Sequence, residues 1–468
     1  MSKHKKLLLP YQVQNTENII NILNKNNSVL DASDTGTGKT YSSVCACAIL
    51  ELKPIIICPK AVMSNWKNVC KIFKVKPFFI VNYETLKYCK YYDEKSNRIE
   101  CPYISIKKVK VMDEFGEPKY TEQYEWLKLP KDVIFIFDEV HKCSNIHTYN
   151  GLLLRAARET TKNKIILLSA TLADNEQKFK IFYYVLNFID REEMEKNNTS
   201  FKECMRLCSM WLNYVKNPMY EIHQKLFPEK ATRMKIETLG DLFPETQITA
   251  TPYSMGKTTE EKIESEYKLI FGALLELKDQ KSKDKSSILV KILRSHQKIE
   301  LLKIPTFMEL ALDFVDNGLS VVIFVNFTKT IETLASLLKT DCLIYGEQTD
   351  KQRQQAIDDF QSNKKHILIC NSKAGGVGIS LHDVHKKRRR ASIISPCWSS
   401  IDLVQVLGRI HRAGGTKSLQ RIIYSATGVE EKIATKLQAK LKNLKNINDG
   451  DLNLSNIKFE SKLQEFSD

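Results

Sequence analysis

The sequence has no Cys-x-x-Cys pair, although 12 of its 468 residues are cysteine. Cysteines scattered in this way match neither the ligand spacing of a zinc ribbon nor a disulfide framework, and they favour a reducing, intracellular compartment. Cys204 and Cys208 lie one helical turn apart. Because no second pair completes a metal site with them, they are predicted to pack in a core.

Long apolar runs are also missing. The basic N-terminus leads only into three leucines at residues 7–9, which are followed by Pro10, and this run is too short for a signal peptide. No other run is long enough to cross a bilayer, so we expect no residence in a membrane. The sequence shows no internal repeat, and a chain of 468 residues predicts about three structural units.

Positive charge is in excess, because 71 Lys and Arg residues stand against 55 Asp and Glu residues and give a net charge of +16. This balance favours a polyanionic partner such as nucleic acid, although charge alone identifies no partner. The densest basic run is Lys-Lys-Arg-Arg-Arg at residues 386–390. It has three interpretations: a phosphate contact, a nuclear-import signal, or a solvated loop between two strands.

A phosphate-binding loop is predicted at residues 31–40, Asp-Ala-Ser-Asp-Thr-Gly-Thr-Gly-Lys-Thr, between a strand-like and a helix-like run. Its glycines let successive backbone N–H groups turn toward phosphate oxygens, next to the positive end of a helix. Ser33 stands where the common pattern has its first glycine. The ATP-binding residues predicted here are Thr35, Gly36, Thr37, Gly38, Lys39, which would reach the β- and γ-phosphates, and Thr40, which would hold Mg²⁺.

Two adjacent acids follow the apolar run Val-Ile-Phe-Ile-Phe at residues 133–137. Such a run indicates a strand buried on both faces of a parallel sheet, and ligands bind at the carboxyl ends of these strands. Asp138 is therefore predicted to hold Mg²⁺, and Glu139 to orient or deprotonate the attacking water. An isolated Asp-Glu pair would be interpreted as a solvated strand end, but the phosphate-binding loop upstream argues against that interpretation.

Strand-like and helix-like runs alternate up to residue 168 and again from residue 321 to 424, which predicts an α/β fold of two parallel-sheet lobes. The segment between them is richer in helix-like runs, such as 201–224 and 258–279. We predict a first lobe at 1–190, a helical insertion and linker at 191–300, a second lobe at 301–445, and a polar tail at 446–468.

Residues 405–412, Gln-Val-Leu-Gly-Arg-Ile-His-Arg, contain two arginines three positions apart. If the segment is helical, Arg409 and Arg412 share one face of the helix. Guanidinium groups so placed can neutralise charge that develops on a γ-phosphate. The alternative is a pair of surface arginines on an amphipathic helix.

The ordered motifs resemble those of superfamily-two helicases and translocases over most of residues 7–440. This resemblance implies two RecA-like lobes that hydrolyse ATP with Mg²⁺ and move along nucleic acid. It implies that Gln12 reads adenine, that Gly378 contacts ATP, that Gln405 joins the two arginines in catalysis, and that Ser169, Ala170 and Thr171 couple hydrolysis to motion. The nucleic-acid contacts that it implies are Lys60, Ser64, Asn326, Thr328, Ser372 and Gly376.

Several residues resemble the SWI/SNF-like arm of this superfamily, whose members commonly move on duplex DNA. They are Trp66, the run Asn-Tyr-Glu-Thr-Leu at 82–86, residues 373–381, and Trp398. Arg233, followed by Leu-Phe-Pro at 242–244, resembles the brace between the lobes in that arm. Ser-Ala-Thr at 169–171 and Ala-Gly-Gly at 413–415 depart from the pattern of that arm. With no accessory module evident, the chain resembles a compact viral or phage member.

Three functions follow as hypotheses. The first is an ATP-driven translocase on double-stranded DNA, monomeric, which remodels DNA-bound complexes or assists transcription beside transcription or replication proteins. The second is a strand-separating RNA or DNA helicase, favoured by the Ser-Ala-Thr motif and by the Asp-Glu-Val-His sequence at 138–141. The third is a non-catalytic nucleic-acid-binding scaffold, which the complete set of catalytic residues disfavours.

Overall fold

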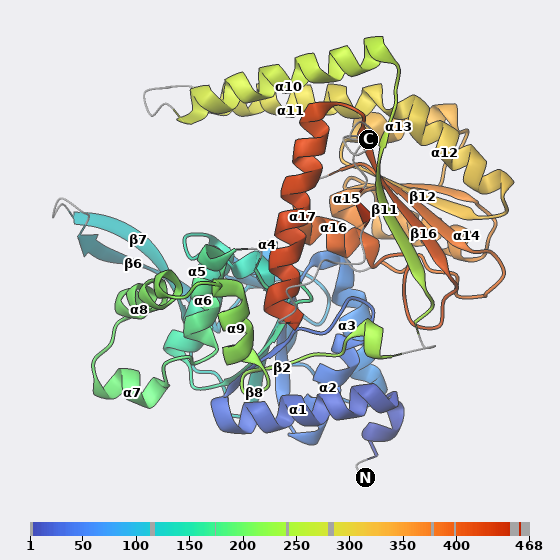
Figure 1. Ribbon diagram of the computed structural model, residues 1–468. Helices are drawn as coiled ribbons and strands as arrows, with labels where there is room; N and C mark the ends of the chain where they lie inside the picture. The colour runs from blue at the N-terminus through green and yellow to red at the C-terminus, as the bar shows by residue number, and fades with distance from the viewer. Residues whose placement is uncertain are drawn as a thin grey trace. The chain divides into compact units, whose positions relative to one another are not determined.

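The computed structural model describes residues 3–112, 118–173, 175–239, 243–278, 285–375, 379–396, 399–449 and 458–459. The chain forms two compact units. Met1–Leu239 with Asn443–Leu452 make up the first, called lobe 1, and Gly240–Lys442 with Asn453–Asp468 make up the second, called lobe 2. Each lobe is built on its own parallel sheet (Figure 1).

The sheet of lobe 1 has the strand order β10-β1-β9-β8-β2-β3, and all neighbours are parallel. Along β8, Phe135 and Phe137 belong to the core on one face, while Ile134 and Ile136 belong to the core on the other. The strands are β1 (Ser28–Asp31), β2 (Lys53–Cys58), β3 (Phe79–Asn82), β8 (Val133–Asp138), β9 (Lys164–Leu168) and β10 (Ala231–Thr232).

Helices cover both faces of this sheet. The core around Ile136 takes in α1 (Pro10–Asn26), α2 (Lys39–Ile49) and α3 (Met63–Phe73). The core around Phe135 takes in α5 (Tyr149–Thr160), α6 (Glu176–Val185), α7 (Arg191–Lys196), α8 (Phe201–Tyr214) and α9 (Pro218–Leu226). Between β3 and β8 the chain forms α4 (Tyr83–Leu86) and two antiparallel pairs: β4 (Lys90–Tyr92) with β5 (Arg98–Glu100), and β6 (Ile104–Met112) with β7 (Pro118–Trp126).

The sheet of lobe 2 is also parallel, with the order β13-β14-β12-β15-β16-β11-β17. The strands are β11 (Thr246–Tyr253), β12 (Ser320–Val325), β13 (Leu343–Ile344), β14 (Ile367–Asn371), β15 (Arg390–Ile394), β16 (Ser418–Ser425) and β17 (Lys458–Phe459). The helices are α10 (Lys257–Lys278), α11 (Lys285–Leu302), α12 (Ile304–Asp316), α13 (Thr328–Leu337), α14 (Asp350–Gln361), α15 (Ser372–Gly375), α16 (Ser400–Leu407) and α17 (Gly428–Asp449).

These two sheets confirm the predicted α/β fold class. Residues 191–300, predicted as a helical insertion and linker, contribute α7 to α9 and β10 to lobe 1, and β11, α10 and α11 to lobe 2. Cys204 and Cys208 are both buried and unbonded in α8, as expected of packing residues. No helix in the described ranges is both long and apolar enough to span a bilayer.

The single helix predicted over 201–224 is wrong. In the structure α8 ends at Tyr214 and α9 begins at Pro218. Proline lacks a backbone N–H and disfavours helical geometry at the residue before it, so it suits the first position of a new helix. Asn217 caps that new helix, because its side chain accepts a hydrogen bond from the backbone N of Tyr220.

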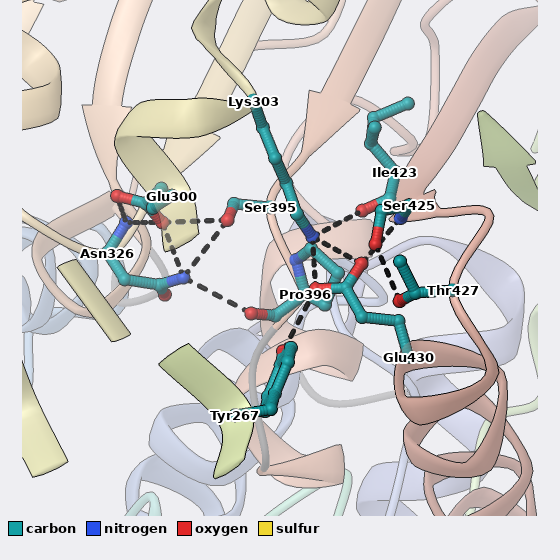
Figure 2. Close-up of polar contacts among 10 residues, drawn as sticks. All are labelled: Tyr267, Glu300, Lys303, Asn326, Ser395, Pro396, Ile423, Ser425, Thr427 and Glu430. Atoms are coloured by element: carbon teal, nitrogen blue, oxygen red, sulfur yellow. Dashed lines mark hydrogen bonds and ion pairs between the residues drawn. The ribbon is translucent and has the colours of Figure 1, made fainter. Parts of the chain in front are cut away.

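Lobe 2 buries two carboxylates where several of its strands end (Figure 2). Glu430 accepts hydrogen bonds from the Lys303 ammonium at 2.6 and 2.7 Å and from the Tyr267 hydroxyl at 2.9 Å. Glu300 accepts bonds from the backbone N and side-chain amide of Asn326 and from the hydroxyl of Ser395. Each carboxylate is therefore compensated, as burial of a charge requires.

Replacing Lys303 by methionine should destabilise lobe 2 by about 3–5 kcal/mol, because Glu430 would then stay buried without its cation. Lys329→Met is the matched control, since it breaks an exposed pair with Glu332 in lobe 2 and should cost under about 1 kcal/mol. The free energy of unfolding of both variants is measured by urea denaturation, monitored with a fluorescent label attached to lobe 2. Restoration of stability in Lys303→Met/Glu430→Gln would support this account, and equal losses for the two single variants would contradict it.

Candidate active site

The predicted phosphate-binding loop connects β1 to α2 at the carboxyl edge of the lobe 1 sheet. Gly36 and Gly38 have φ values of 84° and 94°, which glycine adopts without strain. The Lys39 ammonium donates to the carbonyls of Ser33 at 2.6 Å and Asp34 at 3.1 Å. Burial lowers the pKa of Lys39, and the charges of nearby Asp31, Glu139, Asp138 and Asp34 oppose this shift.

Gln12, near the start of α1, lies directly against this loop. Its Nε2 donates to the Thr37 carbonyl at 3.0 Å, and its Oε1 accepts from the Leu9 backbone N at 3.0 Å. A Cβ atom added at Gly38 would lie 2.2 Å from Gln12 Nε2. The structure thus brings Gln12 to the loop, while its reading of adenine stays a prediction.

Gly38→Ala should weaken ATP binding by more than about tenfold, because alanine is strained at this φ and its methyl group would displace Gln12. Equilibrium binding of a fluorescent ATP analogue measures the loss. Gly38→Ala/Gln12→Ala, compared with Gln12→Ala alone, separates the two causes, since both variants lack the Gln12 side chain and differ only in the strain at residue 38. Unchanged affinity in the single variant would show that the loop tolerates a side chain there.

Ser33 explains why the first glycine of the common pattern is dispensable. Its Oγ accepts a hydrogen bond from the backbone N of Met234 at 2.8 Å, and its own backbone N donates to Asp31 Oδ1. The residue is fully buried and is not among those with positive φ. A serine side chain at this position therefore ties the loop to the segment after β10.

That segment supports the loop through side chains which motif reasoning did not place. Arg233 pairs with Asp34 at 2.6 Å, and both residues belong to lobe 1. Behind the loop, Asn15 donates to the fully buried Asp31 at 2.9 Å and accepts from Thr232 at 2.8 Å. The only sequence signal for this network was the resemblance that singled out Arg233.

Asp138 ends β8 and is held on two sides. Trp66 of α3, itself fully buried, donates from Nε1 to Asp138 Oδ2 at 2.8 Å, and the Tyr83 hydroxyl donates to the Asp138 carbonyl at 2.8 Å. Burial, with the adjacent charge of Glu139, raises the pKa of Asp138 to about 6. A carboxylate that is this costly to ionise favours a cation beside it.

Glu139 follows in a left-handed backbone conformation, with φ of 52°, before the short helix η3 (Val140–Cys143). Its Oε2 lies 3.4 Å from His141 Nδ1, and the same nitrogen lies 3.1 Å from the Ser169 hydroxyl. The Ser169 hydroxyl in turn donates a hydrogen bond to the Thr171 carbonyl and accepts one from the backbone N of Thr171. Glu139 and His141 are therefore in contact with the predicted coupling residues, which are Ser169, Ala170 and Thr171.

These residues fit a magnesium ion. Mg²⁺ prefers oxygen ligands and is commonly held by one or two carboxylates together with substrate phosphates and water. Asp138 supplies a buried carboxylate and Thr40 a hydroxyl in the first turn of α2. No cluster of three or more His, Cys, Asp or Glu suited to a metal occurs among the described residues, so the phosphates would complete such a site.

The two arginines of lobe 2 are not helical, which corrects the expectation of a shared helix face. The helix α16 ends at Leu407, because the chain turns at Gly408. Both guanidinium groups nevertheless converge on the Ile379 carbonyl, each at 3.1 Å. Arg409 is buried and also donates to the Gln405 carbonyl at 2.8 Å, whereas Arg412 is half-buried.

The predicted nucleic-acid contacts differ in exposure. Lys60, in the short helix η2 (Lys60–Val62), is exposed, as are Ser64 in α3 and Thr328 at the start of α13. Asn326 and Ser372 are engaged inside lobe 2, where Ser372 donates to the Val325 carbonyl. The role of all five stays a prediction. Four other residues named above lie outside the described residues: Gly376, Gly378, Trp398 and Leu242.

The basic run at 386–390 is only partly solvated. Arg390 begins β15, is almost fully buried, and packs over the ring of Phe360 with its charge 4.5 Å from the ring centre. It also donates to Asn363 Oδ1 at 2.7 Å. Lys386, Lys387 and Arg389 are exposed, which is compatible with all three interpretations of the run, whereas Arg390 is buried and is not part of a solvated loop.

Comparisons with known proteins cover most of the chain. The chain matches the family model "Type III restriction enzyme, res subunit" over residues 5–174 and "Helicase conserved C-terminal domain" over residues 302–414. It is 40% identical over 462 residues to "Putative ATP-dependent RNA helicase L364" of Acanthamoeba polyphaga mimivirus, which covers 95% of this chain and 84% of that protein.

More distant similarities extend over the same length of chain. "ISWI chromatin-remodeling complex ATPase ISW1" of Saccharomyces cerevisiae is 21% identical over 93% of this chain, which spans 40% of that protein. The solved structure "S. cerevisiae Dbp5 bound to RNA and ADP BeF3" superposes with a TM-score of 0.46 and 13% identity, covering 93% of this chain and 92% of that one.

Proposed function

The chain belongs to the superfamily-two helicases, and from that premise we propose that it is a translocase on double-stranded DNA. It is an ATP hydrolase of that family. The proposal has three parts. The chain would move along duplex DNA, and it would do so without having to separate the strands. This movement would serve to remodel DNA-bound complexes or to assist transcription.

The hydrogen bond from Trp66 to Asp138 carries this proposal. Trp66 is one of the residues by which the sequence resembles the SWI/SNF-like arm, and it touches the carboxylate proposed to hold Mg²⁺. Arg233, a second such residue, holds Asp34 in the phosphate-binding loop. The features that favour a duplex translocase are therefore parts of the ATP site, and the similarity to a yeast chromatin-remodeling ATPase supports the same direction.

The residues of lobe 1 account for the hydrolytic step. The phosphates of ATP would accept hydrogen bonds from the backbone N–H groups of the loop and from the Lys39 ammonium. Lys39 would then give up its bonds to the Ser33 and Asp34 carbonyls. Thr40 and Asp138 would hold Mg²⁺, which neutralises charge on the phosphates. Glu139 would orient the attacking water and accept its proton, with His141 beside it.

Movement would follow from closure on the nucleotide. We propose that Arg409 and Arg412 contact the γ-phosphate when the lobes close, and that loss of this phosphate releases them. Each lobe would grip the phosphate backbone through surface amides, hydroxyls and basic side chains, without reading sequence. Binding should therefore weaken steeply as the salt concentration rises.

A strand-separating RNA or DNA helicase is the second candidate. The contact between His141 and Ser169 links the Asp-Glu-Val-His sequence to the Ser-Ala-Thr motif, the two features that favour it. The name of the mimivirus relative, an RNA helicase, supports the same candidate.

The rate of ATP hydrolysis distinguishes the two. It is measured without nucleic acid and with duplex DNA, single-stranded DNA, duplex RNA or single-stranded RNA, with Lys39→Ala as the blank. Stimulation by duplex DNA above all others is expected for the translocase, and displacement of a bound protein from DNA is then the next test. Stimulation mainly by single strands or RNA, with unwinding of a tailed duplex, would establish the helicase instead.

A further inference from the structure

A cavity of about 1210 Å³ lies in lobe 1 among α5, α6, α7 and α8, apart from the residues assigned to ATP. Figure 1 shows these four helices on one side of the lobe 1 sheet. The volume exceeds that of an ordinary small-molecule site, which is about 300–1,000 Å³. We call it the α5–α8 cavity. We propose that it binds a small organic oxyanion, a phosphate or carboxylate group carried on an apolar or aromatic body.

Arg158 of α5 is the observation on which this proposal rests. It lines the cavity with only 6% of its surface exposed. In the described part of the chain no carboxylate pairs with it: its polar contact is a long one of 4.0 Å to Met194 Sδ, and its Nε has no hydrogen-bond partner. Burial lowers the pKa of this guanidinium and so does the charge of Arg191, whereas Tyr184, Cys204 and Asp190 oppose the shift. An anion in the cavity would supply the missing partner.

Arg158 differs from the two other arginines that line the cavity, because each of those has a carboxylate partner. Arg155 pairs with Glu159 at 2.8 Å, and Arg191 pairs with Glu195 at 3.2 Å. These four residues line the cavity together with Arg158, and so do Glu122 and the exposed Lys202. Arg158 is therefore the buried arginine of this lining for which the described residues supply no carboxylate partner.

Each of the two arginines of α5 lies against an aromatic ring. Arg158 lies over the ring of Tyr184 at 4.8 Å and Arg155 over that of Phe201 at 4.1 Å, and the two rings meet edge to face at 5.0 Å. The ring occupies one side of each guanidinium group, and the N–H groups of the guanidinium are the part that can donate hydrogen bonds to a ligand. Oxygen atoms of a phosphate or carboxylate are the groups that such N–H groups bind.

Two helices begin at the same cavity, and one backbone N–H in the first turn of each is already capped, by the Thr148 hydroxyl at α5 and by the Ser200 hydroxyl at α8. The lining of the cavity includes Tyr149, the first residue of α5, and Phe201, the first residue of α8. Backbone N–H groups in the first turn of a helix attract anions. The walls between these polar groups are apolar, with Leu152, Met194 and Met205, which suits an anion with an apolar body. Recognition of a phosphate or carboxylate is the chemistry that all these features share.

Methionine methyl groups make the test local. With ¹³C-methyl methionine, Met194 and Met205 report on the cavity, while Met234, bonded to Ser33, reports on the phosphate-binding loop. The probes are phenyl phosphate, benzoate and, as a neutral analogue, benzyl alcohol. We expect the resonances of Met194 and Met205 to move with phenyl phosphate or benzoate, and comparison of these two identifies the preferred anion.

Arg158→Met should weaken this binding at least about tenfold, the size expected for losing a hydrogen bond to a charged group. Arg206→Met, which removes an exposed arginine paired with Glu203 on α8, is the matched control and should bind as the parent does. Arg158→Met should fold, because it removes a buried charge and keeps an unbranched chain. If it did not fold, Arg158→Lys would carry the test, since it keeps the charge and loses the planar fork.

Several results would overturn the proposal. They are equal shifts with benzyl alcohol, shifts at Met234 alone, no shift at Met194 or Met205 with either anion, or unchanged affinity in the Arg158 variant. None of these depends on ATP hydrolysis, so the inference stands or fails independently of the proposed function.

Discussion

Glu139→Gln should bind ATP with nearly unchanged affinity and hydrolyse it about 10²–10⁴ times more slowly, the range expected for loss of a general base. Glutamine keeps the shape of the side chain and cannot accept a proton from water. The groups proposed to bind phosphate, which are Lys39 and the backbone of residues 36–38, are untouched by this change. Binding of a fluorescent ATP analogue and single-turnover release of phosphate measure the two quantities separately.

Glu51→Gln is the control, because it removes the same charge from an exposed position on lobe 1. It should leave both binding and turnover unchanged. Normal turnover in Glu139→Gln would refute the role assigned to Glu139. Loss of ATP binding in that variant would instead show that Glu139, 3.4 Å from His141, maintains the shape of the site.

The sequence predicted the parts of this site that depend on local rules. Gly36 and Gly38 were identified because a loop that curls around phosphate requires positive φ, and both have it. The position of Asp138 at the end of β8 followed from a run of five apolar residues, which is typical of a strand buried on both faces of a parallel sheet. The fold class was predictable for the same reason, since strand-like and helix-like runs alternate in each lobe.

Contacts between distant segments could not be predicted in this way. Asn15 and Thr232 meet behind Asp31 because β10 pairs with β1, about 200 residues away in the sequence. A strand of two residues is too short to be recognised from its sequence pattern. The helical expectation for Arg409 and Arg412 failed because α16 ends at Leu407, before the first of them. Their convergence on the Ile379 carbonyl depends on tertiary structure, which residue spacing does not encode.

Arg412→Ala should hydrolyse ATP about 10³-fold more slowly, at the low end of the effect of an arginine that stabilises the transition state, while binding nucleotide nearly normally. Arg412 is the cleaner of the two arginines to test, because it is half-buried, whereas Arg409 is buried and holds the Gln405 and Ile379 carbonyls. Alanine at 409 would therefore also destabilise lobe 2.

The experiment compares steady-state hydrolysis at saturating nucleic acid with the midpoint of thermal unfolding. Arg294→Ala, which removes an exposed arginine of lobe 2 from α11, is the control and should change neither. Arg412→Lys should recover little of the rate, because an ammonium lacks the planar fork that grips two phosphate oxygens. An unchanged rate in Arg412→Ala would mean that this arginine does not reach the nucleotide. A slower rate with a lowered midpoint would mean that its bond to the Ile379 carbonyl is structural, since a catalytic contact with ATP leaves the stability of the free protein unchanged.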